Sequence, residues 1–284
     1  MKMMSDSAAR TARSAARKAE DSAPFQALAR VGYAVNGLLH VMIGLIAIGV
    51  ATGSGGAGGT GGSGGAPADQ SGALGQLAAS PGGVFVLWAI VIGLAALGLW
   101  QVVQAFLVPA REPKRKWAHR AIELGKGVVY LAIAGTAFTF ASGATSDAAK
   151  TTQDSTATLL RLPGGILVLV LLGLFVVVIG GFFVYRGAAG KFTDAISVPD
   201  GAPGIAIVAL GVVGYVAKGI ALGVVGTLFL VAAYTTDPAK ATGLDGALKS
   251  LVGLPFGPVI LIGVGVGLIA FGVYSFARAR FARL

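Results

Sequence analysis

The stretch ILVLVLLGLFVVVIGGFFVY, residues 166–185, runs for twenty residues without a charged side chain. At a rise of about 1.5 Å per residue, a helix of this length spans the hydrocarbon core of a bilayer, about 30 Å. Five other apolar stretches are also long enough to span it: Val31–Ala51, Val84–Val108, Ile122–Ala141, Ile205–Ala233 and Phe256–Ala277. The sequence therefore predicts an all-α membrane protein with six transmembrane helices.

The composition favours a membrane and argues against several kinds of chemistry. Apolar residues make up 55% of the chain and charged residues 12%, and the mean hydropathy is +0.80, whereas a soluble domain is about 25% charged. The absence of cysteine excludes disulfides and thiol chemistry, and two histidines are too few for a metal site of their own. We find no paired carboxylates in the spans, no serine–histidine arrangement and no nucleotide motif. We therefore expect no enzyme, no metal and no cofactor.

The basic residues predict the orientation in the membrane. Sixteen lysines and arginines lie in the N-terminal segment, the second and fourth loops and the C-terminus, but only four lie in the other three loops. Because basic loops stay on the cytoplasmic side, we predict a bacterial inner (plasma) membrane protein with both termini in the cytoplasm. The net charge of +10 is spread over these short loops, so we expect contact with the bilayer and not with nucleic acid.

The six stretches repeat in pairs. A glycine recurs in the odd-numbered stretches, at Gly37, Gly127 and Gly219. Each even-numbered stretch follows a proline, and a glycine comes seventeen residues after that proline, at Gly98, Gly180 and Gly272. Two residues later stands an aromatic: Trp100, Phe182 and Tyr274. We predict three two-helix hairpins that share one orientation and form a pseudo-threefold bundle about the membrane normal.

The predicted boundaries divide the chain into a basic cytoplasmic segment, 1–24, and repeats at 25–110, 111–196 and 197–284. Repeat 1 carries a glycine-rich outer loop, Gly53–Gly65. Before each proline, apolar residues recur at helical spacing, as in Leu74, Leu77 and Ala78. This spacing predicts short amphipathic helices that lie on the outer membrane surface.

One motif of the repeats resembles a known family. Arg30–Gly37 has the pattern R-x-G-Y-x-x-N-G, and a G-A-L-x-x-L segment and a proline follow it from Gly72 onward. Together these residues resemble the bacterial membrane family known as domain of unknown function 1206, over roughly residues 25–280. The middle copy lacks the Gly-Tyr pair and the G-A-L triplet. The resemblance implies three tandem two-helix domains and brings no activity with it.

Polar residues share one level of the odd-numbered stretches. A charge at the bilayer centre costs about 2.5–3.5 kcal/mol on insertion scales, so such residues are candidates for function. Two interpretations stay open: these side chains face the axis and hold an anion, a lipid phosphate or water, or they reach to the interface and fix the helix height. The polar tier consists of Asn36, Lys126 and Lys218, with Tyr33, Glu123 and Tyr215 one turn earlier.

Two further features are candidate sites. His40 lies three residues beyond Gly37, where it is either a hydrogen-bonded structural residue or a proton-sensitive residue of a pore. A basic cluster in the second loop is expected to contact anionic lipid headgroups; it consists of Arg111, Lys114, Arg115 and Lys116.

Three functions are compatible with these observations. The leading hypothesis is a non-enzymatic scaffold or accessory membrane subunit, which binds a membrane-protein partner or forms a homo-oligomer through glycine-rich helix faces. The first alternative is a small channel or carrier, for an anion, that uses the polar tier. The second is a protein that binds a lipid or another hydrophobic ligand between its hairpins.

Overall fold

The computed structural model describes residues 23–54, 67–107 and 116–282. Helices form nearly all of the regular structure in these ranges, and an isolated β-bridge joins Ile196 to Ala282. The all-α fold is thus confirmed. The long helices are α2 (Ala23–Thr52), α4 (Gly83–Leu107), α5 (Lys116–Ala141), α7 (Gly165–Ala188), α8 (Ala202–Thr235) and α10 (Gly257–Phe281). The short ones are α3 (Gln70–Ala79), α6 (Ala148–Arg161), α9 (Gly243–Val252), η2 (Lys191–Ala195) and η3 (Pro238–Lys240).

Each of the six apolar stretches lies on one long helix. Within the residues that the structure describes, four helices are long and apolar enough to cross a membrane: α2 from Arg30 onward, α7, α8 and α10. Helices α4 and α5 carry shorter apolar segments, Gly83–Ala96 and Gly127–Ala141. The chain therefore has several helices that suit a membrane protein.

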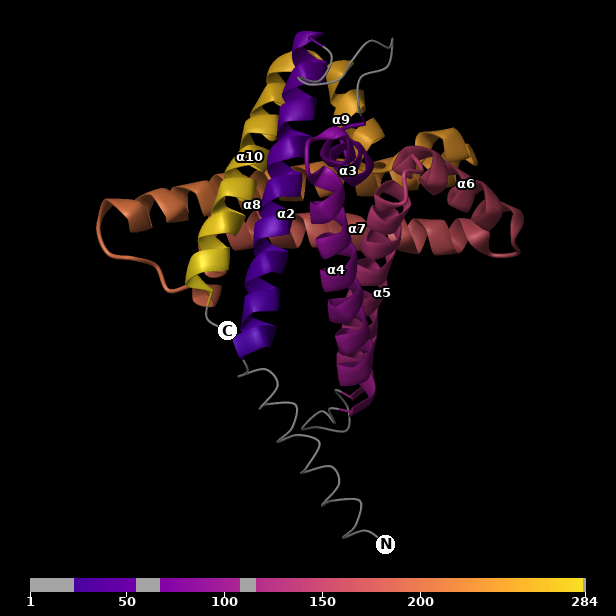
Figure 1. The fold of residues 1–284 in the computed structure, drawn as a ribbon. Coiled ribbons are helices and arrows are strands. Elements are labelled where there is room, and N and C mark those ends of the chain that lie inside the picture. The colour runs from indigo at the N-terminus through magenta and orange to yellow at the C-terminus, as the bar shows by residue number, and fades with distance from the viewer. Residues whose placement is uncertain (1–22, 55–66, 108–115, 283–284) are drawn as a thin grey trace, which may run out of the picture.

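The long helices do not pair as the predicted hairpins. The closest neighbours are α4 with α5, α7 with α8, and α10 with α2, and α8 also packs on α10 (Figure 1). Each even-numbered apolar helix thus packs on the odd-numbered helix that follows it in the chain, and the last packs on the first. The hairpin α2–α4 has little contact of its own, so the structure does not confirm the predicted hairpin packing for this part of the fold.

The repeated glycines explain this pairing. An added Cβ at Gly37 would lie 2.7 Å from the carbonyl oxygen of Gly272, and one at Gly272 would lie 2.6 Å from that of Gly37. The same reciprocal approach joins Gly180 to Gly219, at 2.7 and 2.6 Å, and Gly98 to Gly127, at 3.2 and 3.1 Å. Because a side chain at any of these positions would push the backbones apart, glycine sets the closeness of each pair.

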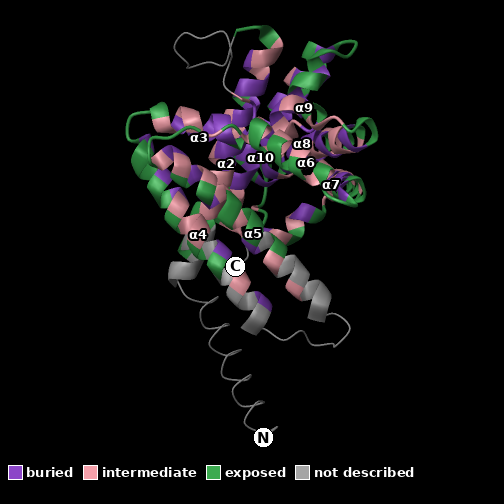
Figure 2. Cartoon of the chain, turned by 90° about the vertical axis from the view of Figure 1, so that its right-hand side faces the viewer, coloured by how far each residue is buried: buried purple, intermediate pink, exposed green. Residues whose placement is uncertain are grey.

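The pair α7–α8 runs across the direction of the other four long helices (Figures 1 and 2). This arrangement differs from the predicted bundle, in which all six helices follow one axis. Buried residues concentrate around α10 (Figure 2), which packs on α2 and also on α8; we call this region the junction of α2, α8 and α10. This junction forms the centre of the molecule and carries most of the residues of the polar tier.

The short helices α3 and α9 contribute their apolar faces to the main core. Leu74 and Leu77 of α3, and Leu248 and Leu251 of α9, are buried together with residues of α2 and α10. The predicted short helices are thus confirmed, but the apolar faces of α3 and α9 are covered by protein and not by a membrane surface. Burial inside the core removes more apolar area from water than lying on an interface would.

Candidate functional site

Polar residues of α2 and α10 bond to each other inside the junction. The Asn36 side-chain amide donates a hydrogen bond to the Ser275 hydroxyl, at 3.3 Å, and that hydroxyl donates to the carbonyl of Phe271, at 2.8 Å. His40 Nδ1 donates to the carbonyl of Asn36, at 2.8 Å, and its ring lies 4.7 Å from the ring of Phe271. His40 is buried and hydrogen-bonded, which agrees with a structural role.

Lys218 of α8 lies between aromatic rings of its neighbours. Its Nζ is 4.3 Å from the ring centroid of Phe271 on α10 and 5.3 Å from that of Phe183 on α7. A cation over the face of an aromatic ring is attracted by the ring quadrupole, most strongly where water is excluded. The Lys218 side chain is therefore held at the junction by contacts within the protein.

The two tyrosines of the tier, Tyr33 and Tyr215, face cations. Arg278 of α10 donates a hydrogen bond through Nη2 to the Tyr33 hydroxyl, at 3.2 Å, and its Cζ lies 4.2 Å from the ring centroid. Tyr215 is buried, and the Cζ of Arg186 of α7 lies 5.9 Å from its ring centroid. Both tyrosines thus belong to one polar and aromatic region.

Tyr215 is part of an aromatic cluster that joins α7, α8 and α10. Its ring lies 5.2 to 5.6 Å from four other rings. We call this set the aromatic cluster; it consists of Phe183, Phe192, Tyr215, Phe271 and Tyr274. The cluster packs the three helices together at the end where α7 and α10 terminate.

The loop between α7 and α8 is fixed against this cluster. Phe192 of η2 is fully buried, and its carbonyl accepts a hydrogen bond from the Tyr274 hydroxyl, at 3.4 Å. The Ser197 amide donates to the Phe281 carbonyl at the end of α10, at 2.8 Å. The loop between α7 and α8 is therefore anchored both to the aromatic cluster and to the end of α10.

The sequence did not identify six residues of this region as candidate site residues: Phe183, Arg186, Phe192, Phe271, Ser275 and Arg278. Phe192 lies in a loop, where hydropathy gives no signal of burial. Ser275 is one polar residue in an apolar helix. Arg278 fits the pattern of basic residues that predicts orientation, and this pattern does not indicate a specific contact. The sequence does carry one signal beside them: an aromatic residue recurs two residues after the repeated glycine, and Tyr274 is its copy in α10.

The polar-tier residues of the middle repeat lie on a different helix pair from those of the first and third repeats. Glu123 and Lys126 lie on α5, and their side chains lie outside the described residues. Helix α5 packs mainly on α4, away from the junction of α2, α8 and α10. In the basic cluster, Arg111, Lys114 and Arg115 fall outside the described ranges, and Lys116 opens α5 without a described side chain.

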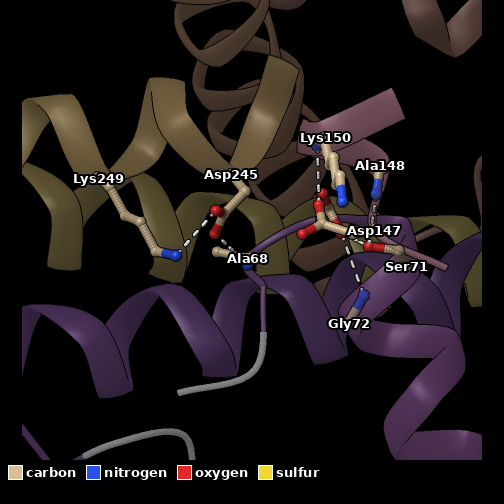
Figure 3. Close-up of polar contacts among 9 residues, drawn as sticks. Ala68, Ser71, Gly72, Asp147, Ala148, Lys150, Asp245 and Lys249 are labelled. Carbon is tan, nitrogen blue, oxygen red and sulfur yellow. Dashed lines mark hydrogen bonds and ion pairs between the residues drawn. The ribbon is translucent and has the colours of Figure 1, made fainter. Parts of the chain in front are cut away.

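A second polar cluster joins the short helices at the opposite end (Figure 3). The Asp245 carboxylate on α9 accepts hydrogen bonds from the Ala68 amide, at 2.7 Å, and from Lys249 Nζ, at 2.8 Å. Asp69 caps α3: it accepts from the Ser71 hydroxyl, at 2.6 Å, and from the Gly72 amide, at 3.1 Å. These bonds tie the segment before α3 to α9, which lies more than 170 residues later.

Asp69 is almost completely buried, and this changes its protonation. Burial raises the pKa of the Asp69 carboxyl above its usual range, and the nearby negative charge of Asp245 raises it further. The hydrogen bonds from Ser71 and Gly72 oppose this rise because they stabilise the carboxylate. The net direction of the shift is upward, so the folded protein favours the protonated form of Asp69 more than the unfolded chain does.

Two further observations bear on the binding of metal ions and apolar ligands. Within the described ranges, no group of three or more His, Asp or Glu residues is placed to hold a metal ion. An apolar crevice lies between α2 and α4. Its lining consists of Val31, Gly32, Val35, Ala89, Ile90, Gly93 and Leu94.

Known proteins supply one family and one relative of similar length. The chain is similar to the uncharacterized protein YxxB of Bacillus subtilis (strain 168), with 27% identity over 259 residues that cover 90% of each chain. No solved structure matches. The family model named Domain of Unknown Function (DUF1206) matches three segments, 31–107, 124–190 and 213–282. Since these segments cover most of the chain and each contains one odd-numbered and one even-numbered apolar helix, the protein belongs to the DUF1206 family.

Proposed function

We propose that this chain is a non-enzymatic scaffold or accessory subunit of the bacterial plasma membrane, which acts by binding another membrane protein or a second copy of itself. The observation that supports this function is the filled junction of α2, α8 and α10. There the Asn36 amide bonds to Ser275, and Lys218 packs on Phe183 and Phe271. Because side chains fill the centre, the outer faces of the helices are the surfaces that can bind a partner.

The outer faces suit partners in an apolar environment. Along α7, most large side chains are exposed, among them Leu171, Phe175 and Val178, each more than half accessible. In water such a surface would cause aggregation, whereas in a bilayer it contacts lipid tails or neighbouring helices. The proposal assigns part of this surface to a protein partner.

The proposal includes six crossings with both termini in the cytoplasm. Its support is the excess of lysine and arginine in alternate loops. Six crossings of a flat bilayer require α7 and α8 to run closer to the direction of the other four helices than they do in Figure 1. Labelling of single cysteines in the loops with a membrane-impermeant reagent tests this topology.

The channel alternative needs the tier to face water. The contacts of Asn36 and Lys218 argue against it, because their polar groups are engaged by Ser275 and by aromatic rings. In liposomes that contain the purified protein, we expect chloride flux equal to that of empty liposomes. A flux that Lys218→Ala abolishes and Arg280→Ala leaves intact would overturn the scaffold proposal and favour the channel.

A photo-crosslinking experiment tests the scaffold directly. A benzophenone amino acid replaces Phe175 on α7 in one variant and Phe85 on α4 in another; both positions are exposed. In living cells, we expect irradiation to give a discrete protein adduct at one of the two positions. Adducts with lipid alone at both positions would contradict the proposal. Mass spectrometry of the adduct separates a second copy of this chain from a different protein.

The crevice between α2 and α4 is the feature that bears on the second alternative, binding of a lipid tail or another hydrophobic ligand. Its lining residues are apolar, but its volume of about 10 Å³ is room for about one water molecule, so α2 and α4 must separate before a hydrocarbon chain can enter. The variant Gly93→Leu would fill it. If a photoreactive fatty acyl lipid labels the wild-type protein at this crevice and labels Gly93→Leu equally, the crevice is not the binding site.

A further inference from the structure

Three cations from three helices lie against rings of the aromatic cluster or against the neighbouring ring of Tyr33. Lys218 of α8 lies over Phe271, Arg186 of α7 lies near Tyr215, and Arg278 of α10 lies over Tyr33. The rings of Tyr215 and Phe271 are 5.2 Å apart, so the first two cations face adjacent rings. Arg278 follows Phe271 by seven residues, two helical turns along the same face, and its charge acts on Lys218.

Among the described residues, none of these three cations forms an ion pair with a carboxylate. The ion pair in the described ranges that joins a lysine to a carboxylate, Lys249–Asp245, belongs to the cluster at the other end of the molecule. Like charges at close range repel one another, and the cost rises where protein replaces water. An arrangement that gathers three cations without an anion of its own therefore favours binding of an anion from outside.

Two donors at this place are also unused. The Nε atoms of Arg186 and Arg278 are buried and have no hydrogen-bond partner. A buried unsatisfied donor costs about 1–3 kcal/mol, and more on a charged group. Arg186 and Arg278 are each half-buried as whole residues, so both side chains lie at the edge of the protein, where a ligand can approach.

A purely structural explanation accounts for only part of this arrangement. Arg186 and Arg278 lie in the last turns of α7 and α10, where the helix dipole favours cations. Arg280 of the same last turn shares that benefit. The dipole does not explain why Lys218, in the middle of α8, joins the two arginines, or why both Nε atoms lack an acceptor.

We propose that Arg186, Lys218 and Arg278 form a binding site for a phosphate group. The planar guanidinium matches the oxygens of phosphate in a two-point fork, and lysine adds a point charge. The site lies where α7 and α10 end, which is the depth of lipid headgroups if these helices cross the bilayer. A phospholipid headgroup and a free phosphate ion present the same chemistry. This site is independent of the scaffold proposal, since neither requires the other.

The test uses the full chain, purified in a mild non-ionic detergent. One arm measures binding of phosphatidylglycerol by native mass spectrometry, and the other measures binding of inorganic phosphate by calorimetry. We expect Arg278→Gln and Arg186→Gln each to weaken binding in the positive arm by about tenfold, a change of about 1.4 kcal/mol. Arg278→Lys keeps the charge but loses the fork, so we expect an intermediate loss.

Arg280→Gln is the matched control, because it removes the same charge from the same helix end at an exposed position. It should bind as the wild-type protein does. Binding of the lipid alone identifies a headgroup site, and binding of both probes identifies the phosphate group itself as the ligand. The proposal is overturned if neither probe binds, or if Arg280→Gln weakens binding as much as Arg278→Gln. If Arg278→Gln does not fold, Arg186→Gln decides. Neither result affects the crosslinking outcome that tests the scaffold.

Discussion

At the scale of single residues, Asp69 combines a stabilising and a destabilising role. Its carboxylate caps α3, which contributes about 1 kcal/mol in typical proteins. Its burial and the charge of Asp245 disfavour that same carboxylate and raise its pKa above the ordinary value of 3.8. A group with a raised pKa contributes stability below its unfolded pKa and loses it as the pH rises through the folded pKa.

We therefore predict that the wild-type protein loses thermal stability as the pH rises from about 4 towards neutrality. Asp69→Asn keeps a side-chain acceptor for Gly72 but removes the charge, so its Tm should depend less on pH and should equal or exceed that of the wild-type protein at pH about 7. Asp69→Ala should be less stable by about 1 kcal/mol because the cap is lost. Thermal unfolding in detergent over a pH series measures all three. The exposed Asp154→Asn serves as the control, and equal pH slopes for wild type and Asp69→Asn would disprove the prediction.

At the scale of helices, adjacent glycines of α7 have opposite surroundings. A Cβ at Gly180 would lie 2.7 Å from the Gly219 carbonyl oxygen of α8, whereas one at Gly181 would meet nothing within 4 Å. We predict that Gly180→Ala separates α7 from α8 and destabilises the protein by about 1–3 kcal/mol. Gly181→Ala should be neutral or stabilise the helix by about 0.5–1 kcal/mol.

The two alanine variants control for each other, because they make the same chemical change at neighbouring positions. Denaturation in increasing amounts of sodium dodecyl sulfate, followed by circular dichroism, measures the difference. If both variants lose the same stability, close approach at Gly180 does not hold the pair α7–α8 together.

The helices themselves were predictable from the sequence, and their partners were not. Hydropathy identified the six long helices, and helical spacing before the prolines identified α3, α6 and α9. The glycines of the repeats were also visible. The sequence suggested packing within each repeat, but Gly180 of the second repeat meets Gly219 of the third, and Gly272 of the third meets Gly37 of the first. A short connection favours packing between helices that follow each other in the chain. The fit between the helix surfaces decides which glycines come into contact.

At the scale of the whole molecule, the topology in the membrane is open to a direct test. The chain has no cysteine, so single cysteines report one position each. We predict that Ser54→Cys and Thr145→Cys react with a membrane-impermeant maleimide added to spheroplasts of the expressing cells. Asp194→Cys should react only after the membrane is permeabilised. All three positions are exposed in the protein, so a difference in labelling reports the side of the membrane.

Labelling of Asp194→Cys in intact spheroplasts would contradict six crossings with both termini in the cytoplasm. Labelling of Ser54→Cys without Thr145→Cys would show that only one of α4 and α5 crosses. Either result would also remove the argument that places the three cations at the depth of cytoplasmic headgroups, while binding of phosphate to the purified protein would still be decided by its own test.

By itself, the sequence determined the helical class, the apolar character of each helix and the repeated glycines, because these follow from local composition and spacing. The tertiary structure alone decided that α10 packs on α2, that Lys218 lies between Phe183 and Phe271, and that Arg186 and Arg278 join it. The physical reason is that hydropathy reports the surroundings of one helix at a time. Several faces of this chain are equally apolar and rich in glycine, and only the fit between two surfaces distinguishes one partner from another.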